Sequence, residues 1–191
     1  MLYADVTHFD DTDPEVHPAA WKLAEHIRGV IRAATAIPTG YTLESALPCR
    51  RRPGHRKCPG WIRVSRQDIP PYVNWECSNC PDSGLIHHWE DSPYDLRPAR
   101  RWGEPGLLTI ELTDDEHAEL RRLQLLDLDS ERVVWSAYRD RGRLLLVGTD
   151  EDLDNLVGFV AFESNHAEDR RRQRRLDQVI GKLEGVLRSY G

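Results

Sequence analysis

The cysteines are the residues whose type and spacing point most clearly to a chemical role. The chain holds four of them, Cys49, Cys58, Cys77 and Cys80, all between positions 49 and 80. Two residues separate Cys77 from Cys80, a spacing that lets one tight turn direct two thiolates at the same ion. Four thiolates form a closed tetrahedral shell for a divalent cation, so the grouping predicts one structural Zn²⁺ site.

The first pair of cysteines leaves the ligand set open, because eight residues separate Cys49 from Cys58. In one arrangement, residues 50–57 form a loop and all four cysteines bind. In the other, His55 and Cys58 form the first pair and Cys49 stays outside. We favour four thiolates, since an all-cysteine shell is a common structural set. The alternatives to a metal are thiols packed as small apolar side chains, or one disulfide with two free cysteines.

The segment Cys77 to Gly84, Cys-Ser-Asn-Cys-Pro-Asp-Ser-Gly, resembles the second knuckle of a zinc ribbon. The resemblance covers residues 48–91 and departs from that family at the first ligand pair, where a ribbon has two intervening residues. It implies a zinc-stabilised sheet with a binding or scaffolding role, and no particular reaction. The C-terminal half resembles bacterial proteins from which no function carries over.

Positive charge gathers around the cysteines of an acidic chain. The net charge is −6, divided as −4 over residues 1–47, +4 over residues 48–102 and −6 over residues 103–191. A basic, aromatic surface suits nucleic acid, through phosphate neutralisation and base stacking. A protein partner is at least as well supported, because the rest of the chain is acidic. The predicted partner-binding residues are Arg50, Arg51, Arg52, Arg56, Lys57, Arg63, Arg66, Trp61 and Trp89.

The elements expected around this site are a helix and a small sheet. Apolar residues recur at helical spacing between Trp21 and Ala34, and Pro18 suits the first turn of a helix that ends before Pro38. Short alternating segments at 61–66, 72–77 and 85–90 predict antiparallel strands. So small a sheet buries too little apolar area to order itself, and we expect zinc to supply the missing stability.

The second half predicts a β-α-β-β-α module. We expect strands at 107–112, 133–138 and 143–147, a helix at 114–126, and a long C-terminal helix from Asp150. That helix either bends near Asn165 or packs its end outside its own domain. The fold class is therefore α+β, with a helical segment (1–47), a zinc-ribbon-like domain (48–92), a linker (93–106) and the module (107–191).

The sequence favours a non-enzymatic interaction protein, since no nucleophile elbow, phosphate-binding glycine loop or His-Glu-x-x-His motif occurs. Regulation is one role open to such a protein. A metal-dependent hydrolase with a second site near His87, His88 or His166 is the alternative. A homodimer through the C-terminal helix is a further expectation. The acidic start, in place of a secretory signal, and the lack of a long apolar run predict a cytoplasmic protein without membrane contact.

Overall fold

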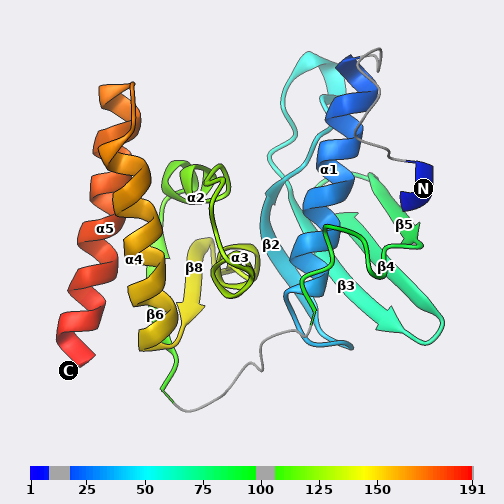
Figure 1. Ribbon diagram of the computed structural model, residues 1–191. Coiled ribbons are helices and arrows are strands. Elements are labelled where there is room, and N and C mark those ends of the chain that lie inside the picture. Colours follow the sequence, from blue (N-terminus) through cyan, green and yellow to red (C-terminus); the bar gives the residue numbers. More distant parts are fainter. Residues whose placement is uncertain (9–17, 98–105, 191) are drawn as a thin grey trace. The chain divides into compact units, whose positions relative to one another are not determined.

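The computed structural model describes residues 1–8, 18–97 and 106–190. It confirms a mixed α+β protein and divides the chain into two compact units, residues 1–100 and 101–191 (Figure 1). The helix predicted within residues 1–47 and the cysteine segment share the first unit. No helix in the described parts of the chain combines the length and apolar character needed to cross a membrane.

The first unit contains a sheet with the strand order β1-β5-β4-β3-β2. Neighbouring strands are antiparallel, except that β1 runs parallel to β5. Strands β1 and β2 were not predicted from the sequence. The strands are β1 (Leu2–Asp5), β2 (Thr42–Pro48), β3 (Trp61–Asp68), β4 (Pro71–Cys77) and β5 (Ser83–His87), and two 3₁₀ turns are η1 (Val6–His8) and η2 (Pro53–His55).

Helix α1 (Pro18–Thr35) covers one face of this sheet (Figure 1). Side chains alternate between the two faces of a strand, so Ile62, Val64 and Arg66 of β3 are buried while the residues between them are not. The helix starts at the predicted proline and buries most of its apolar stripe, including Ile27 and Ile31, whereas Trp21 in its first turns is 47% exposed. These interdigitated side chains form the core that supports the cysteines.

The chain after β5 packs back onto α1. The Leu96 N–H donates to Thr35 Oγ1 (3.0 Å), and Tyr94 and Leu96 are buried. The predicted linker, 93–106, therefore begins with residues that belong to the core of the first unit. Its residues 98–105 lie outside the described part of the chain.

The second unit combines a sheet of order β7-β8-β6 with four helices within its described residues. The sheet is antiparallel throughout. Side chains cap three of the helices, since Thr113, Asp127 and Thr149 each accept a backbone N–H. The elements are β6 (Leu108–Leu112), α2 (Asp114–Leu120), α3 (Leu128–Trp135), β7 (Tyr138–Asp140), β8 (Arg143–Gly148), α4 (Asp150–Asn165) and α5 (Arg170–Tyr190).

The strand predicted at 133–138 is wrong, because Val133 to Trp135 form the end of helix α3. Their β-branched and aromatic side chains favour strands, but Asp127 caps a new helix by accepting the Ser130 N–H at 2.7 Å. The predicted helix 114–126 is correspondingly shorter and ends at Leu120. The helix cap and the burial of Val133 and Val134 therefore outweigh the strand propensity of these residues.

The predicted long C-terminal helix breaks near Asn165 into two helices, α4 and α5. They lie side by side and run in opposite directions (Figure 1). Ser164 Oγ donates to Asp177 Oδ1 at 2.6 Å and ties the two helices together. Leu176, Val179 and Leu183 on the apolar stripe of α5 are fully buried within their own unit. Of the two predicted arrangements, the structure therefore shows the break near Asn165.

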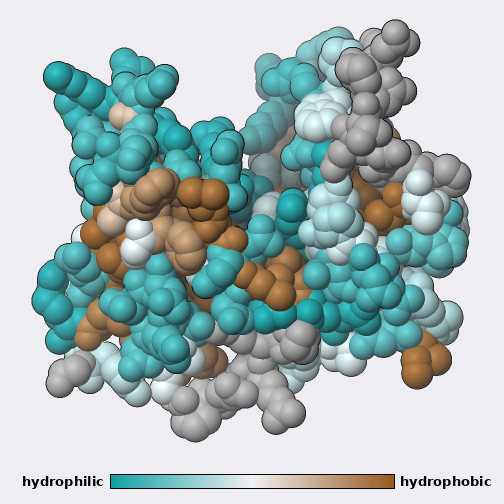
Figure 2. Space-filling model, in the orientation of Figure 1, coloured by the Kyte–Doolittle hydropathy of each residue, from teal (hydrophilic) through white to brown (hydrophobic). Residues whose placement is uncertain are grey.

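The outer surface of the helix pair leaves some apolar area exposed. Figure 2 shows apolar residues at the surface over α4, the helix on which Phe162 is 48% exposed. On α5, a Cβ added to Gly181 or Gly185 would meet nothing within 4 Å. These features leave the expected homodimer through the C-terminal helix as a prediction.

Candidate metal centre

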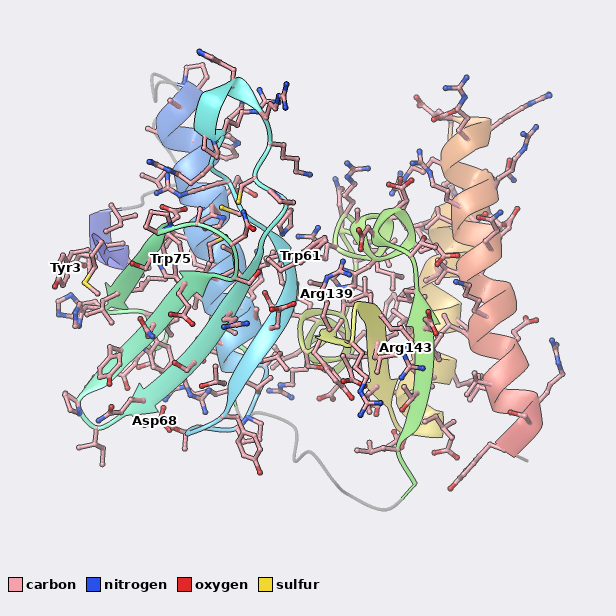
Figure 3. The ribbon with its side chains drawn as sticks, turned by 180° about the vertical axis from the view of Figure 1, so that it is seen from behind. Tyr3, Trp61, Asp68, Trp75, Arg139 and Arg143 are labelled. Carbon is pink, nitrogen blue, oxygen red and sulfur yellow. The ribbon has the colours of Figure 1, made fainter. Side chains whose placement is uncertain are left out.

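Sheet topology brings the two cysteine pairs to the same end of the first unit. Cys49 follows β2 and Cys58 precedes β3, whereas Cys77 ends β4 and Cys80 precedes β5. Because β2, β3, β4 and β5 are antiparallel neighbours, the β2–β3 and β4–β5 connections leave the sheet at the same edge. Asp68 lies at the turn of the β3–β4 hairpin, at the opposite end of β4 from Cys77 (Figure 3).

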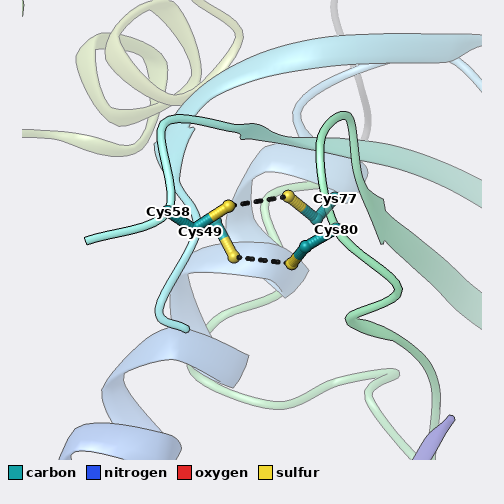
Figure 4. Close-up of side chains that lie close together, drawn as sticks. All are labelled: Cys49, Cys58, Cys77 and Cys80. Atoms are coloured by element: carbon teal, nitrogen blue, oxygen red, sulfur yellow. Dashed lines mark hydrogen bonds between the residues drawn. The ribbon is translucent and has the colours of Figure 1, made fainter. Parts of the chain in front are cut away.

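The four sulfur atoms lie at the spacing of a tetrahedral shell (Figure 4). Cys49 Sγ is 3.7 Å from Cys80 Sγ, Cys58 Sγ is 3.8 Å from Cys77 Sγ, and all four lie within 4.8 Å of one another. A metal–sulfur bond of about 2.3 Å in a tetrahedron separates two sulfurs by roughly 3.8 Å. The cysteines are free thiols, because their sulfur–sulfur distances are well beyond the bond length of about 2.05 Å in a disulfide.

Each sulfur accepts a hydrogen bond from the backbone N–H two residues further along the chain. Three of the donors are Arg51 N to Cys49 (3.4 Å), Gly60 N to Cys58 (3.5 Å) and Asn79 N to Cys77 (3.4 Å). The Asp82 N–H provides the fourth, to Cys80. Such bonds stabilise negative charge on sulfur, so the backbone on both sides of the cluster is arranged for thiolates.

Gly60 permits the close approach of the two connections. A Cβ at this position would overlap Cys77 Sγ and would lie 2.7 Å from Asn79 Cβ and 3.0 Å from the Asn79 nitrogen. The Gly60 carbonyl also accepts the Cys49 N–H at 2.9 Å. Gly60 was not among the residues predicted for the site, although a glycine two positions after a ligand was a signal for it.

The thiols of the cluster differ in how readily they lose a proton. The backbone N–H of Gly60 is the main cause that lowers the pKa of Cys58 to about 7, while burial raises the pKa values of Cys49 and Cys80. Bringing four thiolates together in a buried position is unfavourable unless a positive charge neutralises them. A divalent cation would supply that charge, and the ligands would lose their protons on binding.

The histidines considered as ligands lie outside this cluster. His55 is exposed in the loop between Cys49 and Cys58 and is not part of the cysteine group, the one set of possible metal ligands found within residues 1–8, 18–97 and 106–190. His88 follows the end of β5 and its Nδ1 is 2.9 Å from Asp5 Oδ2. His87 is half-buried on β5, and His166 Nδ1 lies 2.7 Å from the Phe162 carbonyl oxygen in the second unit.

The predicted basic surface is smaller than the sequence analysis expected. Arg66 and Trp89 are buried, and Arg66 donates to the Thr35 carbonyl at 3.2 Å, so both belong to the core. Arg66 has the same strand parity as Ile62 and Val64, which is the physical reason that it points inward. The structure therefore excludes two of the nine predicted partner-binding residues from the surface.

Two other predicted surface residues are engaged by neighbours. Arg63 lies 3.4 Å from Glu44 and 3.7 Å from Glu76. Trp61 is partly exposed, and its backbone N–H donates to Ser78 Oγ at 2.9 Å. We use the name basic loop for residues 50–57. Its basic side chains are Arg50, which is partly covered, and the exposed Arg51, Arg52, Arg56 and Lys57.

Comparisons of this chain with models of protein families, with curated proteins and with solved structures found no match. Function has to be inferred from the geometry and chemistry of the cysteine cluster and its surroundings.

Proposed function

We propose that Cys49, Cys58, Cys77 and Cys80 bind one structural Zn²⁺, in a centre similar to a zinc ribbon, and that this ion orders the basic loop for an acidic macromolecular partner. The observation that carries the proposal is the sulfur spacing of 3.7 and 3.8 Å within each close pair. Zinc suits a tetrahedral shell of four thiolates, and iron is the other metal that such a shell accepts.

The proposed role is non-enzymatic. Four protein thiolates fill the coordination sphere of zinc, whereas catalytic zinc sites keep one position for water or substrate. The metal would instead contribute folding energy to the first unit, because the cluster joins two connections of one sheet. Zinc bound in this way holds both ends of the basic loop, since Cys49 precedes it and Cys58 follows it.

The basic loop also has internal support for a fixed shape. The Cys58 N–H donates to the Arg51 carbonyl at 3.0 Å, and the His55 N–H donates to the Arg52 carbonyl at 3.1 Å. Arg51, Arg52 and Arg56 have no ion-pair partner among the residues that the structure describes. An ordered loop with free guanidinium groups binds an acidic surface at a lower entropic cost than a disordered one.

An acidic protein segment is the partner that we favour, and single-stranded nucleic acid is the second candidate. The observation for nucleic acid is Trp61, a partly exposed aromatic side chain just after the basic loop, on which a base could stack. Both partners would bind with strong salt dependence, because the contacts join exposed opposite charges.

The test measures fluorescence polarisation of a labelled polyglutamate peptide and of a labelled single-stranded DNA as metal-loaded protein is added. We expect binding that weakens with salt, fails in R51A/R52A/R56A, and fails after a chelator removes the metal. The probe that binds more tightly identifies the partner class.

The matched control is R170A/R171A/R174A, which removes the same charge from exposed positions at the start of α5. This control should bind like the wild-type protein. Equal loss in both triple variants, or unchanged binding by the metal-free protein, would overturn the proposed role of the loop.

A further inference from the structure

A pocket lies beside the metal centre, between the basic loop and the β4–β5 connection. Its volume is about 810 Å³, in the range of sites that hold small molecules. The described residues that line it are Met1, Leu2, Arg50, Arg51, Arg52, Pro53, Cys80, Pro81, Asp82 and Ser83. Three consecutive arginines therefore face a space that the cysteine cluster borders through Cys80.

One of these arginines forms part of the pocket wall. Arg50 lies 3.3 Å from Asp82, whose side chain is only 7% exposed, and the Arg50 guanidinium lies 5.8 Å from the centre of the Trp75 ring. The Asp82 carboxylate neutralises Arg50, and the ring restrains its position. Arg50 consequently adds shape to the pocket and little net charge.

The other two arginines remain available for a ligand. Arg51 and Arg52 are exposed and have no ion-pair partner within the described part of the chain. Their backbone is fixed, because Arg51 donates to Cys49 Sγ (3.4 Å) and its carbonyl accepts the Cys58 N–H (3.0 Å). Two guanidinium groups on a fixed backbone present paired donors that match the oxygens of a phosphate or a carboxylate.

Apart from the polar residues Asp82 and Ser83, the remaining lining of the pocket is largely apolar. Met1, Leu2, Pro53 and Pro81 contribute hydrocarbon surface to the pocket. A bare inorganic ion would leave this surface without a partner, whereas a ligand with an apolar body would bury it. The formal charge of −2 on a zinc tetrathiolate borders the pocket only through Cys80, so an anionic group belongs at the arginine end.

We propose that this pocket binds a small organic oxyanion, with its phosphate or carboxylate group held by Arg51 and Arg52 and its apolar body against Met1, Leu2, Pro53 and Pro81. The inference rests on the proposed metal site, because the ion fixes the loop that carries both arginines. The basic loop would then bind a small molecule as well as its proposed macromolecular partner.

The experiment titrates ¹⁵N-labelled, metal-loaded protein with phenyl phosphate and follows amide chemical shifts. Benzoate tests the carboxylate, benzyl alcohol tests the apolar body without charge, and inorganic phosphate tests the charge without the body. We expect saturable shifts at the pocket residues with phenyl phosphate or benzoate, and weaker binding of the other two probes. An equal response to phenyl phosphate and inorganic phosphate would reject the apolar part of the site.

The matched variants are R51A/R52A and R56A/K57A, which remove two positive charges each from the same loop. Only Arg51 and Arg52 line the pocket. R51A/R52A should bind phenyl phosphate at least about tenfold more weakly, because each substitution removes hydrogen bonds to a charged group. R56A/K57A should bind nearly as the wild type does. Equal weakening in both variants would show a diffuse basic surface and overturn the inference.

Elemental analysis of each sample separates this inference from the proposed function. A purified wild-type protein without metal would contradict the proposed zinc site, whereas a metal-loaded protein that shows no saturable binding would contradict the pocket alone. If R51A/R52A does not hold metal, R51K/R52K replaces it, because lysine keeps the charge and loses the paired donors. That variant should bind several-fold more weakly, and unchanged affinity would again reject the arginine contact.

Discussion

Replacing Gly60 by alanine tests the packing of the cysteine cluster with a single methyl group. The added Cβ would overlap Cys77 Sγ and lie 2.7 Å from Asn79 Cβ. Asn79 also contributes a backbone nitrogen at 3.0 Å, so the neighbours cannot yield by a side-chain rotation alone. The connection that carries Cys77 and Cys80 must therefore move away from Cys49 and Cys58.

The expected cost follows from the effect of overpacking in a filled interior. Inserting a methyl group into such a position costs about 1–3 kcal/mol. Because the displaced atoms include one metal ligand, we expect this free energy to appear mainly as weaker metal binding. The dissociation constant for Zn²⁺ should rise roughly 5- to 150-fold.

The assay is a competition titration in which the protein and a chromophoric chelator share a limiting amount of Zn²⁺. The matched control is Gly84→Ala, whose Cβ would lie 2.5 Å from the Leu2 carbonyl oxygen and 2.7 Å from Trp75 Nε1. That substitution overpacks the same sheet without touching a sulfur atom. Unchanged affinity in Gly60→Ala, or an equal loss in both variants, would refute the reasoning.

Two further predictions concern the second unit. His117 is buried and its Nε2 lies 2.8 Å from the Val134 carbonyl oxygen, and burial is the main cause that lowers its pKa from 6.5 to about 3. Its contribution to stability is complete above pH 6.5 and is lost as the pH falls toward 3, so wild-type protein should lose about 2 kcal/mol from this group by about pH 5. Urea titrations should show a flatter pH dependence in His117→Gln, and parallel curves would contradict this assignment. Gly181→Ala adds a Cβ that meets nothing within 4 Å inside helix α5, so thermal unfolding should show a gain of about 0.5–1 kcal/mol. A loss of stability would mean that another surface, such as a second copy of the chain, packs on that face.

Part of the fold could be predicted from the sequence because local chemistry determines it. Pro18 and the apolar spacing after it marked the first residue and the buried face of α1. The alternation in 61–66 and 72–77 placed β3 and β4 within two residues of their bounds. Segments whose propensity and tertiary role agree are the ones that sequence patterns identify.

The remaining elements depend on contacts that a linear pattern does not contain. Strand β1 forms through parallel pairing with β5, more than eighty positions along the chain. Val133 and Val134 favour a strand on their own, yet a cap at Asp127 and burial on one side make them helical. His88 was expected within a strand, but its φ of 55° places it in the left-handed region, where a strand cannot continue.

The candidate site shows the same division. Spacing and residue type identified the four cysteines, because a pair separated by two residues is a local feature. The spacing within the β2–β3 connection could not show whether Cys49 or His55 is the fourth metal ligand. That choice depends on the sheet, which brings the β2–β3 and β4–β5 connections together. The pocket beside the basic loop needs Leu2 on β1 as a wall, so no local pattern could reveal it.

The central claim is that one zinc ion is held by four sulfur ligands. Elemental analysis of the reduced, purified protein, combined with X-ray absorption at the zinc edge, tests it most directly. We predict one zinc per chain and a single shell of four sulfur neighbours at about 2.3 Å. A metal-free yet fully ordered protein, or a shell with a nitrogen or oxygen ligand in place of one sulfur, would contradict the claim.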